Sequence, residues 1–117
     1  NISTGTQNTV VGSAALDANT TSSNNTAVGY QAMTDANGAV DSVAVGSEAL
    51  ANVTTGDYNV GVGFQALKTI TTSGNCVAVG YQALEIIQQV ITLLLVLMLY
   101  NQTQLEIRLV LLERMHY

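Results

Sequence analysis

The chain has 117 residues, of which 9% are charged, and its formal net charge is −5 at pH 7. Lys68 is the single basic residue before position 85, so the Lys and Arg clusters that bind phosphate are missing and a nucleic-acid partner is excluded. One cysteine and one histidine can form neither an intrachain disulfide nor a zinc site, and a start at Asn1 without a signal peptide predicts a fragment of a longer protein.

Residues 1–84 contain five repeats at a spacing of 17 residues, each with a motif such as NTAVGYQAM or CVAVGYQAL. In each motif a valine precedes a glycine, and an alanine follows the glycine three positions later. When the repeats are aligned, each of these positions forms a column of equivalent residues. The three columns are Gly12, Gly29, Gly46, Gly63 and Gly80; Val11, Val28, Val45, Val62 and Val79; Ala15, Ala32, Ala49, Ala66 and Ala83. Strand-forming residues in the motifs and Asn, Thr, Gly and Asp clusters between them predict one coil of an all-β solenoid or β-roll per repeat.

Stacked coils place like residues upon like, which gives the columns a structural meaning. The glycine and alanine columns predict positions with little room, where opposite walls of a thin coil nearly touch. The valines are expected on the other face, together with Thr9, Thr26, Val43, Val60 and Val77. A thin coil cannot bury this apolar face alone, so the face is expected to meet a partner surface.

A partial aromatic column follows the glycines at Tyr30, Phe64 and Tyr81. Exposed aromatic rings are candidate surface contacts, for instance with sugars. Stacking between neighbouring coils or at a chain interface is the favoured interpretation.

Motifs such as SVAVGSEAL and NTAVGYQAM resemble the head repeats of YadA-like trimeric autotransporter adhesins, and they are also similar to repeats in phage tail fibres. The resemblance covers residues 1–84, and the 17-residue spacing departs from the somewhat shorter repeats usual in adhesin heads. It implies a left-handed parallel β-roll in which three chains pack side by side as a homotrimer. It also implies a location outside the cell, at the cell surface or on a virion tail fibre, and a role in attachment to a host-surface glycan or protein.

Residues 85–117 form a hydrophobic tail that is expected to be mainly helical. Leu, Met, Gln and Glu favour helix from about residue 85 to 100, and NQTQ at 101–104 is expected to interrupt it before a second segment. The apolar run 86–100 is shorter than the roughly 20 residues of a membrane span, so no membrane span is predicted. The tail is expected to pack against its copies in the trimer.

The tail begins where a sixth repeat is due, and its codons offer an explanation. In a shifted reading frame, the third base of each codon is read with the first two bases of the next codon. In this frame the codons from residue 85 onward can encode the repeat sequence NNTTGDNTAVG. Methionine has one codon, so the shifted reading at Met98 must be Ala or Val, and at Met115 it must be Ala, where the repeat requires Ala. Residues 85–117 are therefore interpreted as a frame-shifted reading of two further repeats; the alternative is an evolved hydrophobic helix.

No catalytic, cofactor-binding or metal-binding residue is predicted. His116 lies in the shifted tail, and Cys76 is interpreted as a small packing residue. Cys76 shares its column with Asn8, Asn25, Ser42 and Asn59. The acidic residues of the repeats are scattered over different columns, which argues against a paired acid/base site or a repeated calcium-binding turn: Asp17, Asp35, Asp41, Glu48 and Asp57.

The sequence thus predicts a non-enzymatic structural or adhesive fibre segment that attaches to a surface or recognises a host as a homotrimer. One alternative is an ice-binding solenoid, based on a partial threonine column at 20–21, 54–55 and 71–72, although its pairs are adjacent rather than Thr-x-Thr. Another is a frame-shifted fragment with no native function. A hydrolase or lyase on a β-solenoid lacks a supporting acid/base cluster.

Overall fold

The structure is a computed structural model that describes residues 4–115, with only the backbone described at 86–89. Within this part of the chain there are five strands and one helix. The chain divides into two compact units, Asn1–Ile86 and Ile87–Tyr117. The first unit contains the strands and the second contains nearly all of the helix.

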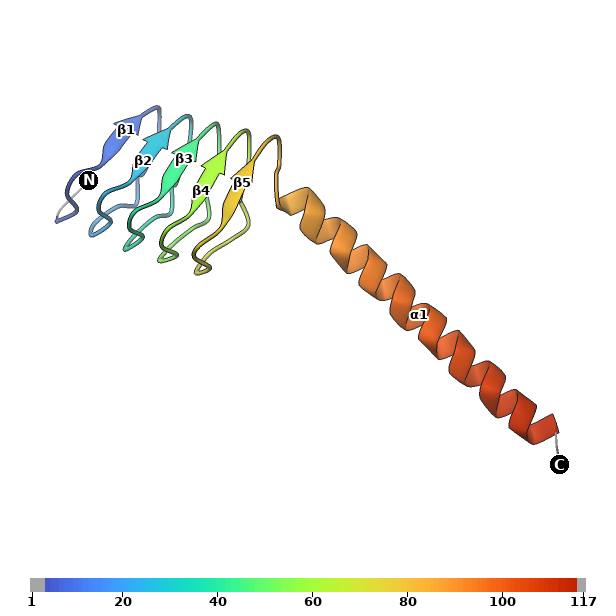
Figure 1. The fold of residues 1–117 in the computed structure, drawn as a ribbon. Coiled ribbons are helices and arrows are strands. Elements are labelled where there is room, and N and C mark those ends of the chain that lie inside the picture. The colour runs from blue at the N-terminus through green and yellow to red at the C-terminus, as the bar shows by residue number, and fades with distance from the viewer. Residues whose placement is uncertain (1–3, 116–117) are drawn as a thin grey trace. The chain divides into compact units, whose positions relative to one another are not determined.

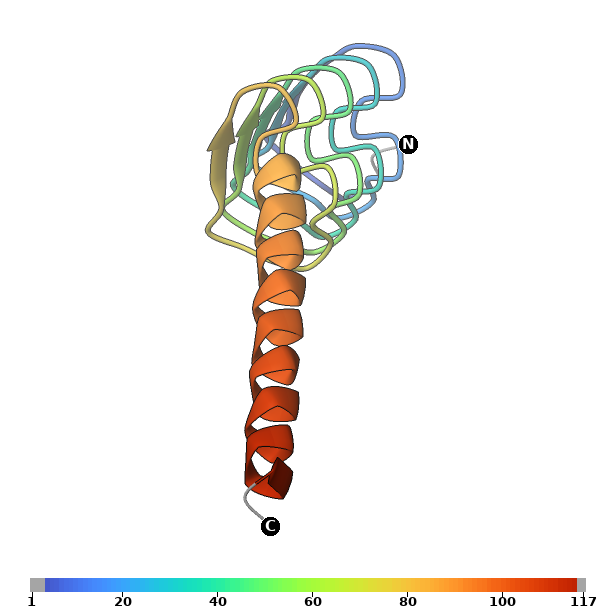
Figure 2. The same cartoon turned by 90° about the vertical axis from the view of Figure 1, so that its right-hand side faces the viewer.

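The first unit is a β-solenoid of about four turns (Figure 1). Its three-residue strands are β1 (Thr9–Val11), β2 (Thr26–Val28), β3 (Val43–Val45), β4 (Val60–Val62) and β5 (Val77–Val79). They form one parallel sheet in sequence order, and each residue pairs with the residue 17 positions later, as Thr9 does with Thr26. Figure 2 shows the strands on one side of the coils and the irregular segments on the other.

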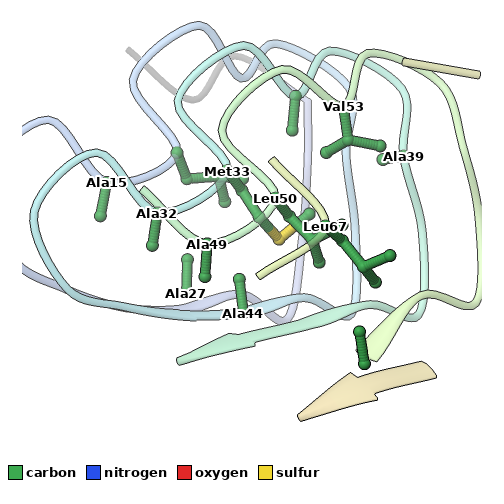
Figure 3. Packing of buried hydrophobic residues seen from close by; sticks show 13 residues of the cluster. Ala15, Ala27, Ala32, Met33, Ala39, Ala44, Ala49, Leu50, Val53 and Leu67 are labelled. Atoms are coloured by element: carbon green, nitrogen blue, oxygen red, sulfur yellow. The ribbon is translucent and has the colours of Figure 1, made fainter. Parts of the chain in front are cut away.

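The core is built from small and aliphatic residues that point into the coils. The middle residue of each strand from β2 onward is buried, and in three of these four strands it is alanine. Met33, Leu50 and Leu67 are almost completely buried opposite the strands, beside the alanine column (Figure 3). A thin coil has room for one long side chain and several short ones, which explains why the repeat alternates Ala with Leu or Met.

The corners of each coil use left-handed backbone at residues other than glycine. In each coil the residue five before the glycine, and those two and four after it, have positive φ, from 48° to 73°. The residues four positions after the glycines are Leu16, Met33, Leu50, Leu67 and Leu84. Such a conformation costs about 1–2 kcal/mol per residue, so packing and hydrogen bonds between coils must hold these corners.

The second unit is one continuous helix, α1 (Glu85–Met115). The predicted break at 101–104 was wrong. Asn, Gln and Thr lower helix propensity only slightly, and the segment has no glycine or proline to interrupt the backbone. The Thr103 hydroxyl donates a hydrogen bond of 3.0 Å to the carbonyl of Leu99, one turn earlier, which satisfies that side chain within the helix.

The unbroken α1 contains a longer apolar stretch than the sequence predicted. The stretch Val90–Met115 is 26 residues long and apolar enough to cross a membrane by length and composition. The prediction of no membrane span was based on a run of 15 residues, so length alone no longer supports it. Polar residues at 101–104 lie near the middle of this stretch, and Glu106 and Arg108 follow them. Charged residues near the bilayer centre are costly.

Removal of α1 provides a test of the division into two units. We expect a chain that ends at Leu84 to lose the helical circular-dichroism signal and to keep its β signal, because the strands and their core lie before this residue. Circular dichroism of the full and shortened chains makes the comparison. Loss of β signal with retention of helical signal would contradict this division.

Candidate functional site

The outward side of the sheet is an apolar surface that runs along the solenoid. The first and third residues of each strand lie on it, and we call these residues the strand face: Thr9, Thr26, Val43, Val60 and Val77 with Val11, Val28, Val45, Val62 and Val79. All are exposed or half-buried, since side chains alternate between the two sides of a strand. Val45, in the middle coil, is 36% exposed, and Val79, in the terminal coil, is 69% exposed.

Aromatic side chains lie just after the strands. Phe64 and Tyr81 stack with ring centroids 5.4 Å apart and an angle of 17° between the planes. Such a pair stabilises neighbouring coils beyond its buried area. Tyr30 is 53% exposed and is separated from Phe64 by one coil, which has Ser47 at this position. Both rings of the stacked pair also remain exposed.

Tyr58 is an exposed aromatic residue outside the aromatic column predicted from the sequence. It is 55% exposed and occupies a left-handed corner with φ 59°. The equivalent corners of other coils hold Asn24, Asp41 and Asn75. Because no other coil has an aromatic residue there, the repeat contains no signal for it.

The glycine column is required for a reason that differs from the predicted one. At Gly46 φ is +135°, and a side-chain Cβ would lie 2.5 Å from the carbonyl oxygen of Gly63 in the next coil. Gly12, Gly29 and Gly63 show the same close approach to the following glycine. The glycines thus allow backbone to pack on backbone between successive coils, whereas opposite walls of one coil were expected to meet there. Four of the alanines lie inside the coils and are buried, and Ala83 is half-buried.

A ladder of hydrogen bonds runs inside the solenoid through the column that includes Cys76. The Asn25 side-chain oxygen accepts the Ser42 backbone N–H at 2.9 Å, and the Ser42 hydroxyl accepts that of Asn59 at 3.1 Å. Asn59 in turn accepts the backbone N–H of Cys76 at 3.0 Å. The column was visible in the sequence, but spacing alone did not reveal that its side chains connect the coils.

The ladder residues also form hydrogen bonds with backbone carbonyl groups between the strands. The side-chain amides of Asn25 and Asn59 donate to the carbonyls of Ala39 and Ser73 at 2.8 and 2.9 Å. Asn25, Ser42 and Asn59 are buried. Buried polar groups that are fully hydrogen-bonded specify one arrangement of the coils. The role of the column is therefore structural, and Cys76 is its last member.

Glu48 and Lys68 form an ion pair between neighbouring coils, and the Gln65 amide also donates to Glu48 at 3.3 Å. The hydrogen bond from Lys68 holds the pKa of the Glu48 carboxyl below its ordinary value, although desolvation opposes this shift. Since the folded pKa lies below the unfolded one, ionised Glu48 stabilises the fold above its unfolded pKa. This contribution is lost as the pH falls through the lowered folded pKa.

We expect Glu48→Gln to remove this part of the acid dependence of stability. The change in the free energy of unfolding should be below about 1 kcal/mol, because the pair is partly exposed to solvent. Urea unfolding at a series of pH values measures it for parent and variant. Identical acid dependence of the two proteins would contradict the assigned role of the pair.

Residues with catalytic or ligand chemistry are not gathered in the part of the chain that the structure describes. No group of three or more His, Cys, Asp or Glu side chains that could hold a metal ion occurs among these residues. Cys76 is half-buried, and its thiol lies 3.5 Å from the Gly74 carbonyl. The remaining candidate, His116, lies outside the described residues.

Comparison of the chain with protein-family models, curated proteins and solved structures finds no match. The class of the protein therefore follows from its architecture. It is a β-solenoid repeat protein with a C-terminal apolar helix.

Proposed function

We propose that the chain is a non-enzymatic structural or adhesive segment of a fibre and acts as a homotrimer. In this proposal its 17-residue repeats form a left-handed parallel β-roll like those of YadA-like adhesin heads and phage tail fibres. The location is extracellular, at a cell surface or on a virion tail fibre, and the role is attachment to a surface or recognition of a host. The observation that supports the proposal is the outward-facing apolar strand face.

The strand face suits lateral association of identical chains. It runs along the whole sheet, and it is rich in valine where a solvated sheet surface would carry polar residues. Each coil is too thin to cover this face with its own residues. Burial between chains contributes about 25 cal/mol per Å² of apolar area removed from water, so a long, regular stripe gains stability with every coil.

The exposed rings of Tyr30, Phe64 and Tyr81 are the proposed contacts with a host-surface glycan or protein. They lie next to the strand face rather than inside the coils. Aromatic rings supply apolar area with a polar edge, which suits both sugars and protein surfaces.

The tail is proposed to pack as α1 against its copies in the trimer, without crossing a membrane. All its side chains from Val90 to Met115 are exposed in the single chain. Those at 90–100 are nearly all apolar, so this part of the helix requires cover. Three solenoids held together raise the effective concentration of the helices for one another. The codons support a frame-shifted origin for this segment, which then has no selected function of its own.

A charge in the strand face tests the proposal. We expect Val45→Lys to dissociate the trimer, because an unpaired ammonium buried between chains costs several kcal/mol, which weakens association about a hundredfold or more. Thr55→Lys is the matched control, since Thr55 is exposed in a turn away from the strand face. Sedimentation equilibrium gives the masses, and circular dichroism confirms the fold. A trimer that survives Val45→Lys would contradict the proposed interface.

Ice binding is the second candidate, and one observation favours it. Thr21 and Thr55 flank Gly38 on one side of the solenoid, since a Cβ at Gly38 would lie 3.8 Å from the Thr21 hydroxyl and 3.5 Å from the Thr55 methyl. The array is interrupted at Gly38 itself. Thermal hysteresis of a dilute solution decides between the two functions.

A further inference from the structure

The aromatic column is interrupted in the middle coil of the solenoid. Tyr30 and Phe64 follow the glycines of the second and fourth coils, and the third coil has Ser47 at this position. Backbone hydrogen bonds hold the three positions in register. The Tyr30 carbonyl accepts the Glu48 N–H at 2.7 Å, and in the next coil the Ser47 carbonyl accepts the Gln65 N–H at 2.9 Å. Ser47 thus lies between two aromatic positions and has a much smaller side chain than either.

The spacing of these positions suits one saturated ring. Neighbouring strands lie about 4.8 Å apart, so equivalent positions two coils apart are separated by about 9–10 Å. Carbon atoms in van der Waals contact are about 3.5–4.0 Å apart, so a single puckered ring can contact an aromatic side chain on each side. Phe64 stacks on Tyr81 of the following coil with 17° between the ring planes. Its other face is therefore directed toward the coil of Ser47.

A second column changes at the same coil. The residues two positions after the glycines are Gln31, Glu48, Gln65 and Gln82. The Gln82 amide donates to the Gln65 side-chain oxygen at 2.8 Å, and the Gln65 amide donates to Glu48 at 3.3 Å. The chain of amides ends there, because a carboxylate has no N–H to donate to Gln31. Among the described residues, the Gln31 amide and the Ser47 hydroxyl thus have no hydrogen-bond partner.

We propose that the interruption at Ser47 binds one neutral pyranose ring of a surface glycan. This inference rests on the proposed attachment function, and it assigns the ligand class and the place where the ligand binds. The C–H groups of the sugar lie against Tyr30 and Phe64. Its hydroxyl groups form hydrogen bonds with the Ser47 hydroxyl, the Gln31 amide and the Glu48 carboxylate. Apolar walls with a few polar groups that fix orientation are typical of small-ligand sites.

Charge at this position favours a neutral sugar. Glu48 is paired with Lys68, the single basic residue before position 85, so the repeats have no second cation for an acidic sugar. The same pair neutralises the carboxylate, which argues against a quaternary ammonium group, another ligand of aromatic rings. Lys68 and Gln65 both donate to Oε2 of Glu48. Oε1 is therefore available to accept a sugar hydroxyl.

Ser47→Tyr is the most selective variant. Tyrosine occupies this column in the second and fifth coils, so the repeat accommodates it, and its ring would occupy the proposed position of the sugar. We expect binding to weaken about tenfold or more, although the variant has one more aromatic ring in the column than the parent. Binding that is equal to or stronger than that of the parent would overturn the proposal, because the rings would then act only as exposed apolar surface.

Tyr30→Ser removes one wall and places in the second coil the serine that the first and third coils have. We expect it to weaken binding as well. Tyr58→Ser is the matched control, since Tyr58 is exposed but lies outside the aromatic column, and it should leave binding unchanged. Equal binding by Tyr30→Ser and Tyr58→Ser would contradict the proposed site. Circular dichroism checks the fold of each variant.

The measurement is saturation-transfer NMR of the full chain with methyl glycosides of glucose, galactose, mannose, N-acetylglucosamine and N-acetylgalactosamine, and with choline. A parent that binds none of the glycosides, or binds choline instead, would overturn the proposal. Sedimentation equilibrium on the same samples separates this result from the proposed assembly. A trimer that binds no glycoside contradicts only the sugar site. A monomer that binds a glycoside, and loses it in Ser47→Tyr, supports the site and contradicts the trimer.

Discussion

Gly46→Val should unfold the middle coil of the solenoid and loosen the coils on either side. The new Cβ would lie 2.5 Å from the Gly63 carbonyl oxygen and 2.6 Å from its carbon, both in the backbone of the next coil. Relief of this clash costs about 1–3 kcal/mol. A β-branched residue at φ +135° adds strain of about 1–3 kcal/mol. Nearest-neighbour contacts hold a solenoid together, so damage in one coil spreads to both neighbours.

The same substitution at Gly80 is the matched control. Gly80 has nearly the same φ, +130°, but a Cβ there would have no next-coil backbone within 4 Å. Gly80→Val thus includes the strain without the clash. We expect a clearly smaller fall in melting temperature, measured by circular dichroism. Equal destabilisation by the two variants would show that the close approach between coils is not what requires glycine.

Asn25→Leu should destabilise the solenoid by an amount similar to that of Gly46→Val. The Asn25 side chain accepts the Ser42 N–H at 2.9 Å and donates to the Ala39 carbonyl at 2.8 Å, and it is 1% exposed. Leucine is similar in size but leaves both groups buried without partners. Each unsatisfied group costs about 1–3 kcal/mol, so the free energy of unfolding should fall by several kcal/mol in denaturant titration.

Asn25→Ser distinguishes the ladder from simple packing. A serine hydroxyl at this position can accept the Ser42 N–H, as the Ser42 hydroxyl accepts that of Asn59. It does not replace the bond to Ala39. We expect the free energy of unfolding to fall less in Asn25→Ser than in Asn25→Leu. If leucine is tolerated better than serine, packing rather than hydrogen bonding governs this column.

Much of the solenoid was predictable because its repeat is regular. The 17-residue spacing placed a strand immediately before each glycine, and a parallel sheet with these strands is found. The alternation within TAV and VAV predicted a valine face that points outward, which agrees with the exposure of Val45 and Val79. Composition also predicted a helical tail, and α1 confirms helix for it.

Other features depend on contacts that spacing does not encode. Leu50 and Gln65 have positive φ, yet neither residue type favours such a corner, so tertiary packing imposes it. The reason for the glycine at 46 lies in the backbone of the next coil. The four polar residues at 101–104 predicted a break that α1 does not have, because a run without glycine or proline leaves the helical backbone intact.

In the proposed assembly, identical chains associate through the strand face into a closed trimer. Native mass spectrometry of the full chain is the decisive measurement, because it counts the chains in each assembly. We expect a main species of three 12.3 kDa chains. A folded monomer at the same concentration, with the β signal intact, would contradict it.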